Sequence, residues 1–173
     1  SISIRTAVLM TLRNEDPARA FARLRVVKDS LDATGEGAWF DYFVLSLSWS
    51  PTYCDGPTAR DDVQQCGQGR RFAFVVHGLW PQHESGWPES CPARESWVPE
   101  DEIDAMLGIM PSKKLIIHEW KKHGTCSGLG MADYFEVTRL LFEKVRIPAR
   151  YLTPQAEILT TPEQLVTDFV KTN

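Results

Sequence analysis

The chain has 173 residues, of which 43% are hydrophobic, and carries a formal net charge of −4. This length and hydrophobic content suffice to bury the core of one domain without a structural metal or an obligate partner, so we expect a monomer. An acidic total argues against tight, sequence-independent retention of nucleic acid, although a catalytic cleft needs only local positive charge. No stretch approaches the ~20 apolar residues of a membrane-spanning helix, and we therefore expect a soluble chain without a membrane partner.

The element signals follow one another without a regular strand-helix-strand alternation. Asp16-Pro17 can cap a helix that runs to Val27, before a first strand over 41–49. A second strand over 72–76 leads into Gly-Leu-Trp-Pro at 78–81, a sequence typical of a turn. Helices are expected over 99–107, over 113–123, over 131–145 and from Thr161, which opens a capping-box pattern. The mixture predicts an α+β fold: a single domain with a central antiparallel sheet packed with several helices.

Two short runs hold three of the four histidines. The first run, FVVHGLWP at 74–81, places a histidine at the end of a buried strand, and the second, HEWKKHGTC at 118–126, packs two more into a helix. Because successive helical residues turn by ~100°, the polar side chains of the second run share an arc of about 140° while Trp120 faces the core. That arc holds His118, Glu119, Lys122 and His123. Glu119 and Lys122, three residues apart, can hold each other charged.

A zinc site is the first alternative, because His-Glu followed by a second histidine is similar to the zinc signature His-Glu-x-x-His. That signature needs histidines four residues apart, whereas His118 and His123 are five apart and diverge by about 140° on a helix. The neighbouring Lys122 also disfavours a divalent cation. We therefore expect no metal and no other cofactor.

Phosphoryl transfer with two histidines as acid and base uses all of these groups and needs no metal. One imidazole can remove the proton of an RNA 2′-hydroxyl while another protonates the departing 5′-oxygen. The Lys122 ammonium can stabilise the charge on the phosphoryl oxygens, an effect on the order of 3 kcal/mol per well-placed donor. Glu119 can orient that cation or keep one histidine protonated.

At these residues the sequence resembles the ribonuclease T2 family of secreted acid endoribonucleases. Both signature blocks are present in order, with His-Glu-x-x-Lys-His-Gly-Thr-Cys intact in the second, and a weaker likeness extends from FVLSLSWSPTYC at 43–54 to the helix at 133–135. The resemblance implies a metal-independent endoribonuclease whose partner is single-stranded RNA. It implies cleavage by transphosphorylation through a 2′,3′-cyclic phosphate to 3′-phosphate ends, with broad base specificity.

The resemblance also implies roles for individual residues. His77 matches the histidine assigned as the general acid, and His123 matches the one assigned as the base, although the order of these two roles stays open. Glu119 and Lys122 match the pair assigned to transition-state stabilisation.

Three further residues match substrate-binding positions. His118 corresponds to a phosphate-binding histidine, Trp80 to an aromatic that stacks on a base, and Gln82 to a position where some members read a base edge with aspartate. Two of them also have a structural interpretation: His118 can be a hydrogen-bonded helix residue, and Trp80 can simply pack. His83 lies outside both blocks and is expected to be structural. Lys121 projects away from the arc, as a solvated surface charge does.

The four cysteines are even in number and contain no Cys-x-x-Cys pair, which favours disulfides in an oxidising compartment, secreted or periplasmic. Three pairings can form, and reduced thiols in a cytosolic protein are the alternative. The family pattern implies Cys54–Cys66 and Cys91–Cys126. The second bond would hold His77 in one cleft with the second block and contribute roughly 3 to 4 kcal/mol.

The resemblance divides the chain into an N-terminal extension over 1–40 with a helix, and a catalytic domain over 41–173. Family members usually continue past the final helix with further strands, and two alternatives stay open: this is a shortened member, or its C-terminal strands lie beyond Asn173. Two other functions remain open. A ribonuclease-derived RNA-binding module would tolerate loss of a catalytic histidine, yet both are present, and a metal-dependent hydrolase would be sensitive to chelators.

Overall fold

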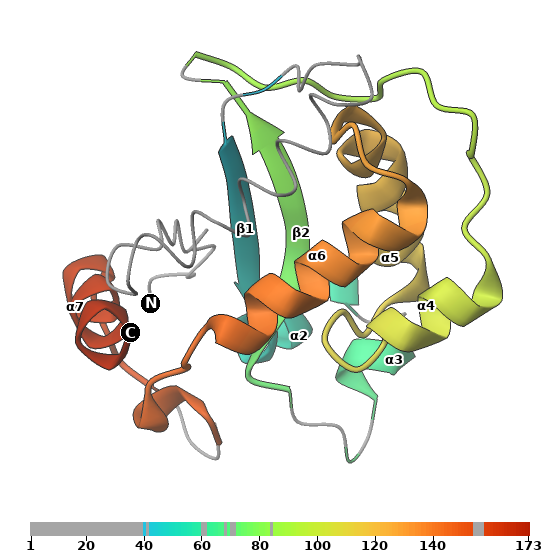
Figure 1. Cartoon of the computed structure of the whole chain (residues 1–173). Coiled ribbons are helices and arrows are strands. Elements are labelled where there is room, and N and C mark those ends of the chain that lie inside the picture. The colour runs from blue at the N-terminus through green and yellow to red at the C-terminus, as the bar shows by residue number, and fades with distance from the viewer. Residues whose placement is uncertain are drawn as a thin grey trace.

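The computed structural model describes residues 40, 42–59, 62–67, 69, 72–83, 85–153 and 158–173. The helix expected from Asp16 lies outside these residues. The elements, in chain order, are β1 (Tyr42–Trp49), α2 (Ser50–Asp55), η1 (Pro57–Ala59), α3 (Val63–Cys66), β2 (Phe74–Gln82), α4 (Glu100–Met106), α5 (Lys113–Lys122), η2 (Gly124–Cys126), α6 (Met131–Lys144), η3 (Ala149–Tyr151) and α7 (Pro162–Thr172). Figure 1 shows the two strands at the centre of these helices, and the α+β prediction is confirmed.

The described strands β1 and β2 pair antiparallel, and β2 is longer than its sequence suggested. The turn expected over 78–81 is wrong, because these residues continue the ladder opposite β1 as far as Gln82. Pro81 is tolerated there because it lies near the end of a two-stranded sheet, where a strand residue can lack a ladder donor. The first signature block therefore forms an extended strand, not a strand followed by a tight turn.

The register of the two strands shifts by one residue at His77. Ser46 pairs with Gly78 and Leu47 pairs with Val76, so His77 has no partner of its own and forms a β-bulge. In a regular strand His77 would point to the same face as Leu79, which is completely buried. The bulge frees His77 from that alternation and turns it out of the core.

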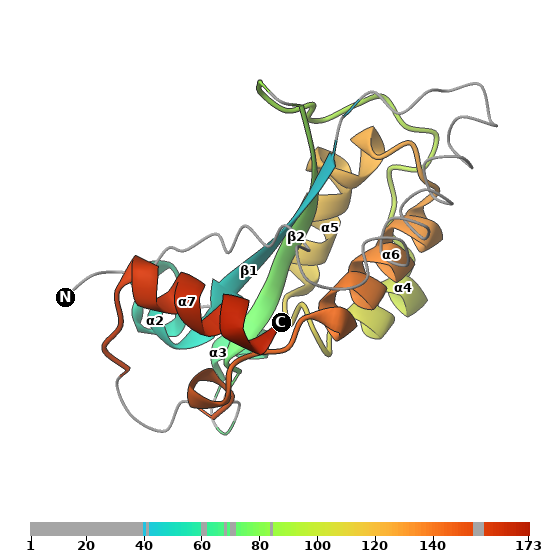
Figure 2. The same ribbon diagram turned by 60° about the vertical axis from the view of Figure 1, so that its left-hand side comes forward.

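Helices α4, α5 and α6 lie on one side of the strands, and α7 lies on the other, as the two views of Figures 1 and 2 agree. The core between them is continuous. Its buried members include Leu45, Leu47, Val76, Leu79, Ile103, Met106, Ile116, Trp120, Tyr134 and Phe135. An aromatic cluster attaches α7 to the strands: the ring of Phe169 lies 5.4 Å from Phe74 and 6.1 Å from Tyr151.

Helix α5 is fixed at both ends and along its buried face. The Ser112 hydroxyl accepts a hydrogen bond from the Leu115 amide at the N-terminus, and His123 forms the C-cap. The buried Trp120 indole donates to the Glu95 carbonyl at 2.9 Å. The helix therefore holds its polar residues at a fixed rotation relative to the core, as the sequence predicted.

Helices α4 and α6 match their predicted ranges to within one residue at each end, and α7 begins one residue after the predicted start at Thr161. At the start of α7 the Thr161 hydroxyl accepts from the Gln164 amide, as the capping pattern predicted. The short helices α2 and α3 were not predicted, because four to six residues carry too little periodicity. No helix in the described ranges is long and apolar enough to cross a membrane.

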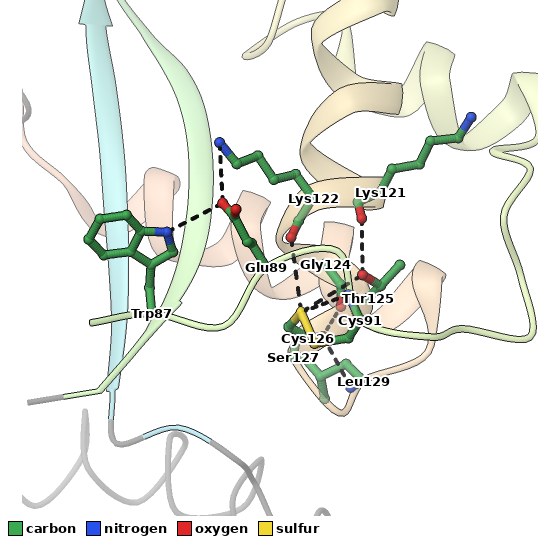
Figure 3. The surroundings of a disulfide bond; sticks show 10 residues. All are labelled: Trp87, Glu89, Cys91, Lys121, Lys122, Gly124, Thr125, Cys126, Ser127 and Leu129. Atoms are coloured by element: carbon green, nitrogen blue, oxygen red, sulfur yellow. Dashed lines mark hydrogen bonds and ion pairs between the residues drawn. A yellow bond between two sulfur atoms is a disulfide. The ribbon is translucent and has the colours of Figure 1, made fainter. Parts of the chain in front are cut away.

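Two disulfides join the four cysteines in the expected pairs. Cys54 bonds to Cys66, with Cα atoms 5.3 Å apart, and closes the α2–α3 segment. Cys91 bonds to Cys126, with Cα atoms 5.1 Å apart, and ties the loop after β2 to η2, directly after α5. Figure 3 shows this second bond beside Lys122.

Candidate active site

His77 is held by a contact at each ring nitrogen. The Ser48 hydroxyl of β1 lies 3.1 Å from Nδ1, and a carboxylate oxygen of Glu119 lies 3.6 Å from Nε2. The His77 side chain is 42% exposed, so a ligand can reach it. Burial is the main cause that lowers the His77 pKa, followed by the positive charges of His118 and Lys122.

Glu119 is a buried carboxyl group directly over β2. Only 1% of its side chain is exposed, and the Trp80 indole donates to its Oε2 at 2.7 Å. Burial raises the Glu119 pKa to about 7, against the hydrogen bond from Trp80 and the charge of Lys122, which both lower it. Near neutral pH this group is therefore divided between its protonated and ionised forms.

Gly78 makes this close approach of α5 to β2 feasible. A Cβ atom at position 78 would overlap Glu119 Oε2 and lie 2.6 Å from Trp80 Nε1. Because Gly78 has no side chain, the Glu119 carboxyl group can lie directly against β2. Glycine commonly occurs where two elements approach this closely.

His123 is buried at the C-terminal end of α5, with 6% of its surface exposed. Burial lowers its pKa to about 4, and the charges of Lys122, His118 and His77 act in the same direction while Glu89 opposes them. Among the described residues its Nδ1 atom has no hydrogen-bond partner. His123 is therefore neutral over most of the pH range, with an unused polar atom.

The Trp80 ring lies close to both imidazoles. Its centroid is 5.6 Å from that of His77 in an edge-to-face arrangement, and 5.3 Å from that of His123 at an interplanar angle of 32°. One indole thus contacts both histidines and donates its N–H to Glu119. The structure brings together all four residues that the sequence suggested for catalysis, since Lys122 and His123 interact electrostatically.

Lys122 is paired with a residue that sequence reasoning missed. Its Nζ lies 3.6 Å from Glu89 Oε2 in the loop after β2. Lys122 thus forms an ion pair with Glu89, whereas the helical spacing suggested Glu119. Figure 3 shows Glu89 between Lys122 and the exposed Trp87, whose indole N–H donates to the same carboxylate at 3.4 Å. The Cys91–Cys126 bond and a 2.7 Å hydrogen bond from the Ser90 amide to the Lys122 carbonyl hold this loop against α5.

The remaining candidates lie around this cluster. His118 is exposed on α5, and its charge acts on both His77 and His123. The Gln82 amide donates to the Pro81 carbonyl at 2.9 Å. Outside the cluster, the backbone amide of His83 donates to the Gly86 carbonyl, and Lys121 is exposed.

Sequence reasoning also missed Ser48 and Gly78 as parts of the site. Ser48 lies within the weaker block at 43–54, where the alternation of serine with large apolar residues in Ser-Leu-Ser-Trp at 46–49 is the available signal. Gly78 stood in the first signature block but was interpreted as a turn residue. In the described part of the chain, no three His, Cys, Asp or Glu side chains are grouped so that they could hold a metal ion.

The fold and both signature blocks have counterparts among known proteins. A family model described as the ribonuclease T2 family matches residues 40–165. The chain therefore belongs to the ribonuclease T2 family. Residues 1–39 lie outside the match.

Individual relatives agree with this membership. A ribonuclease from Aeromonas hydrophila is 44% identical over 121 residues, which cover 70% of this chain and 54% of that protein. A crystal structure of RNase NT in complex with 5′-AMP is 31% identical with a TM-score of 0.61, covering 77% of this chain and 72% of that chain. The chain spans about half the length of the curated ribonucleases it matches.

A shorter likeness connects the chain to a protein of another kind. Glucans biosynthesis glucosyltransferase H from Rhodopseudomonas palustris is 50% identical over 52 residues, which cover 30% of this chain and 7% of that protein. A likeness to so small a part of a longer enzyme carries no activity over to this chain.

The first prediction concerns the glycine under Glu119. Gly78→Ala should destabilise the fold by roughly 1 to 3 kcal/mol, because the new methyl group must displace a buried carboxyl group. In NMR spectra the Trp80 indole proton should lose the shift that its hydrogen bond to Glu119 gives it.

Gly108→Ala is the matched control, since a Cβ atom there would meet no atom within 4 Å. It should change stability by no more than about 0.5 kcal/mol. Equal effects of the two substitutions would contradict the steric role of Gly78.

The second prediction concerns the charge of Glu119. Its folded pKa of about 7 lies above the ordinary value of 4.5, so its contribution to stability is present below pH 4.5 and is lost as the pH rises through 7. Glu119→Gln keeps an acceptor for Trp80 without the charge, and should be more stable than wild type at pH 8 by roughly 1 to 3 kcal/mol.

Chemical denaturation at pH 8 and pH 4.5 measures this difference, which should nearly vanish at the lower pH. The linkage from His123 is common to both proteins and cancels. A Gln variant less stable than wild type at pH 8 would show that ionised Glu119 stabilises the fold.

Proposed function

We propose that the chain is a metal-independent endoribonuclease that cleaves single-stranded RNA by transphosphorylation. The observation that carries the proposal is the pair of imidazoles, His77 from β2 and His123 from the end of α5, that both lie within 6 Å of one indole, with centroid distances of 5.6 and 5.3 Å. Two histidines can supply both the base and the acid that attack by a 2′-hydroxyl requires.

The relatives support this proposal by their own descriptions. The Aeromonas hydrophila relative is a ribonuclease, and RNase NT is solved with 5′-AMP. We extend ribonuclease activity from them to this chain because the histidines, Glu119 and Lys122 of the signature blocks meet in one place.

In the proposed first step His123 acts as the base. With a pKa of about 4 it is neutral in mildly acidic solution and can take the 2′-hydroxyl proton. The 2′-oxygen then bonds to phosphorus, the bond from phosphorus to the 5′-oxygen breaks, and His77 gives its Nε2 proton to the leaving oxygen. The 2′,3′-cyclic phosphate is opened by water in the reverse sense, with the roles exchanged, to leave a 3′-phosphate.

Charge stabilisation falls to the groups beside the histidines. Lys122 would exchange the exposed carboxylate of Glu89 for phosphate oxygens, a feasible exchange because both side chains are partly solvated. Glu119, 3.6 Å from His77 Nε2, would stabilise the imidazolium form of that ring when ionised.

The substrate-binding roles remain proposals. His118, exposed one turn before Lys122, would contact a phosphate, and the partly exposed Trp80 ring would stack on a base. The Gln82 amide would have to leave the Pro81 carbonyl to contact a base edge. Stacking tolerates any base, so we propose broad base specificity. We also propose a monomer in an oxidising compartment, secreted or periplasmic, because of the two disulfides.

The test is cleavage of an RNA oligonucleotide in EDTA, beside a copy with one 2′-deoxy position, with termini identified by mass spectrometry. We expect 2′,3′-cyclic phosphate ends and no cleavage at the deoxy position. His77→Ala and His123→Ala should each lower the rate roughly 10²- to 10⁴-fold, while His83→Ala serves as the matched histidine control. Cleavage that requires a divalent metal, or cleavage at the deoxy position, would overturn the mechanism.

The pH dependence of kcat/KM should be bell-shaped, with its maximum in mildly acidic solution. The base must be neutral, which requires a pH above about 4 for His123. The acid must be protonated, and the lowered pKa of His77 places this limit below its ordinary value of 6.5. A rate that continues to rise above pH 7 would contradict these assignments.

A further inference from the structure

The β1 strand supplies one polar contact to the cluster that the proposed chemistry leaves unused. The Ser48 hydroxyl lies 3.1 Å from His77 Nδ1, on the opposite side of the ring from Glu119 near Nε2. The hydrogen bond at one nitrogen of a histidine decides which tautomer the neutral ring adopts. A hydroxyl can accept from an Nδ1–H group or donate to an unprotonated Nδ1, so Ser48 selects a tautomer of His77 together with Glu119, the group at the other ring nitrogen.

The strands fix this contact on a rigid element. Ser48 pairs with Val75, and by alternation it shares a face of β1 with Ser46, which pairs with Gly78 beneath Glu119. The β-bulge brings His77 to that face. Groups carried on paired strands hold their geometry better than groups on loops.

We propose that Ser48 is a positioning residue that holds His77 as the Nδ1–H tautomer, so that Nε2 alone exchanges protons with the substrate. The proposal rests on the proposed function in one respect, the role of His77 as the acid. It assigns Ser48 no contact with RNA.

Ser48 neither gains nor loses a proton in the transphosphorylation step or in the hydrolysis step. In the imidazolium form, Nδ1–H donates to Ser48 Oγ and Nε2–H goes to the departing 5′-oxygen, which keeps the electron pair of its broken bond to phosphorus. The neutral ring then retains Nδ1–H on Ser48, and its Nε2 lone pair takes a proton from water during hydrolysis. The alternative Nε2–H tautomer has no lone pair at Nε2 and cannot take that proton.

In the described part of the chain, the other titratable groups that face His77 come from α5 or its end. Glu119 lies near Nε2, His118 and Lys122 lower the His77 pKa, and the charge of His77 in turn lowers the His123 pKa. Below pH 7 Glu119 is mostly protonated, so its Oε1 atom, 3.6 Å from Nε2, carries no negative charge that would favour the Nε2–H tautomer. The contact with Ser48 is the hydrogen bond that β1 contributes to this ring.

The kinetic test compares Ser48→Ala with Ser48→Thr. The Ala variant should lose about tenfold in kcat/KM, and the alkaline limb of its pH profile should move to lower pH, because the imidazolium loses an acceptor. The Thr variant keeps a hydroxyl and should restore both the rate and the limb.

Ser50→Ala is the matched control two residues along the chain. Its buried hydroxyl accepts a hydrogen bond from the Gln65 amide at 2.8 Å, so its loss should lower stability without moving the pH profile. An unmoved limb in Ser48→Ala, or a Thr variant as impaired as the Ala variant, would overturn the proposal.

The tautomer itself can be measured without substrate by ¹⁵N NMR of the His77 ring at pH 6.5. Wild type and Ser48→Thr should show protonated Nδ1, and Ser48→Ala should show a mixture or the Nε2–H form. The same tautomer in all three would refute the proposal. If wild type cleaves no RNA, the proposed function fails while this measurement still decides the role of Ser48.

Discussion

The site depends on one buried contact, the hydrogen bond from the Trp80 indole to the Glu119 carboxyl group across the bare backbone of Gly78. A buried carboxyl group is unfavourable unless it is hydrogen-bonded, so this contact fixes the rotation of α5 against β2. The same indole lies next to both His77 and His123.

The closeness of these side chains also makes protonation of the two histidines unfavourable. His77 and His123 both lie near Lys122 and His118, and each has a pKa below its ordinary value. Among the residues that the structure describes, Nδ1 of His123 also has no hydrogen-bond partner, and perturbed pKa values together with an unsatisfied buried polar atom are typical of functional sites.

Much of the fold could be predicted, because long amphipathic helices and capping residues are local signals. The range of α5 and the Thr161 cap were found from spacing alone, and the fixed order of the second block placed Glu119 and His123 on one arc. The course of β2 through 78–81 was missed, since Gly and Pro favour turns locally while cross-strand pairing decides here. The partner of Lys122 was missed for a similar reason. Glu89 is distant from Lys122 in the sequence, and its loop is held next to α5 by the Cys91–Cys126 disulfide.

The β-bulge at His77 lets one strand serve two requirements that conflict in a regular ladder. Phe74, Val76 and Leu79 all remain buried although Val76 and Leu79 are three positions apart, an offset that would place them on opposite faces of a regular strand. In a strand without the extra residue, the side chain at position 77 would point into the core, and an exposed imidazole there would interrupt the row of buried apolar residues. Because of the register shift, the neighbouring strand residues maintain the core while His77 alone is turned out of it.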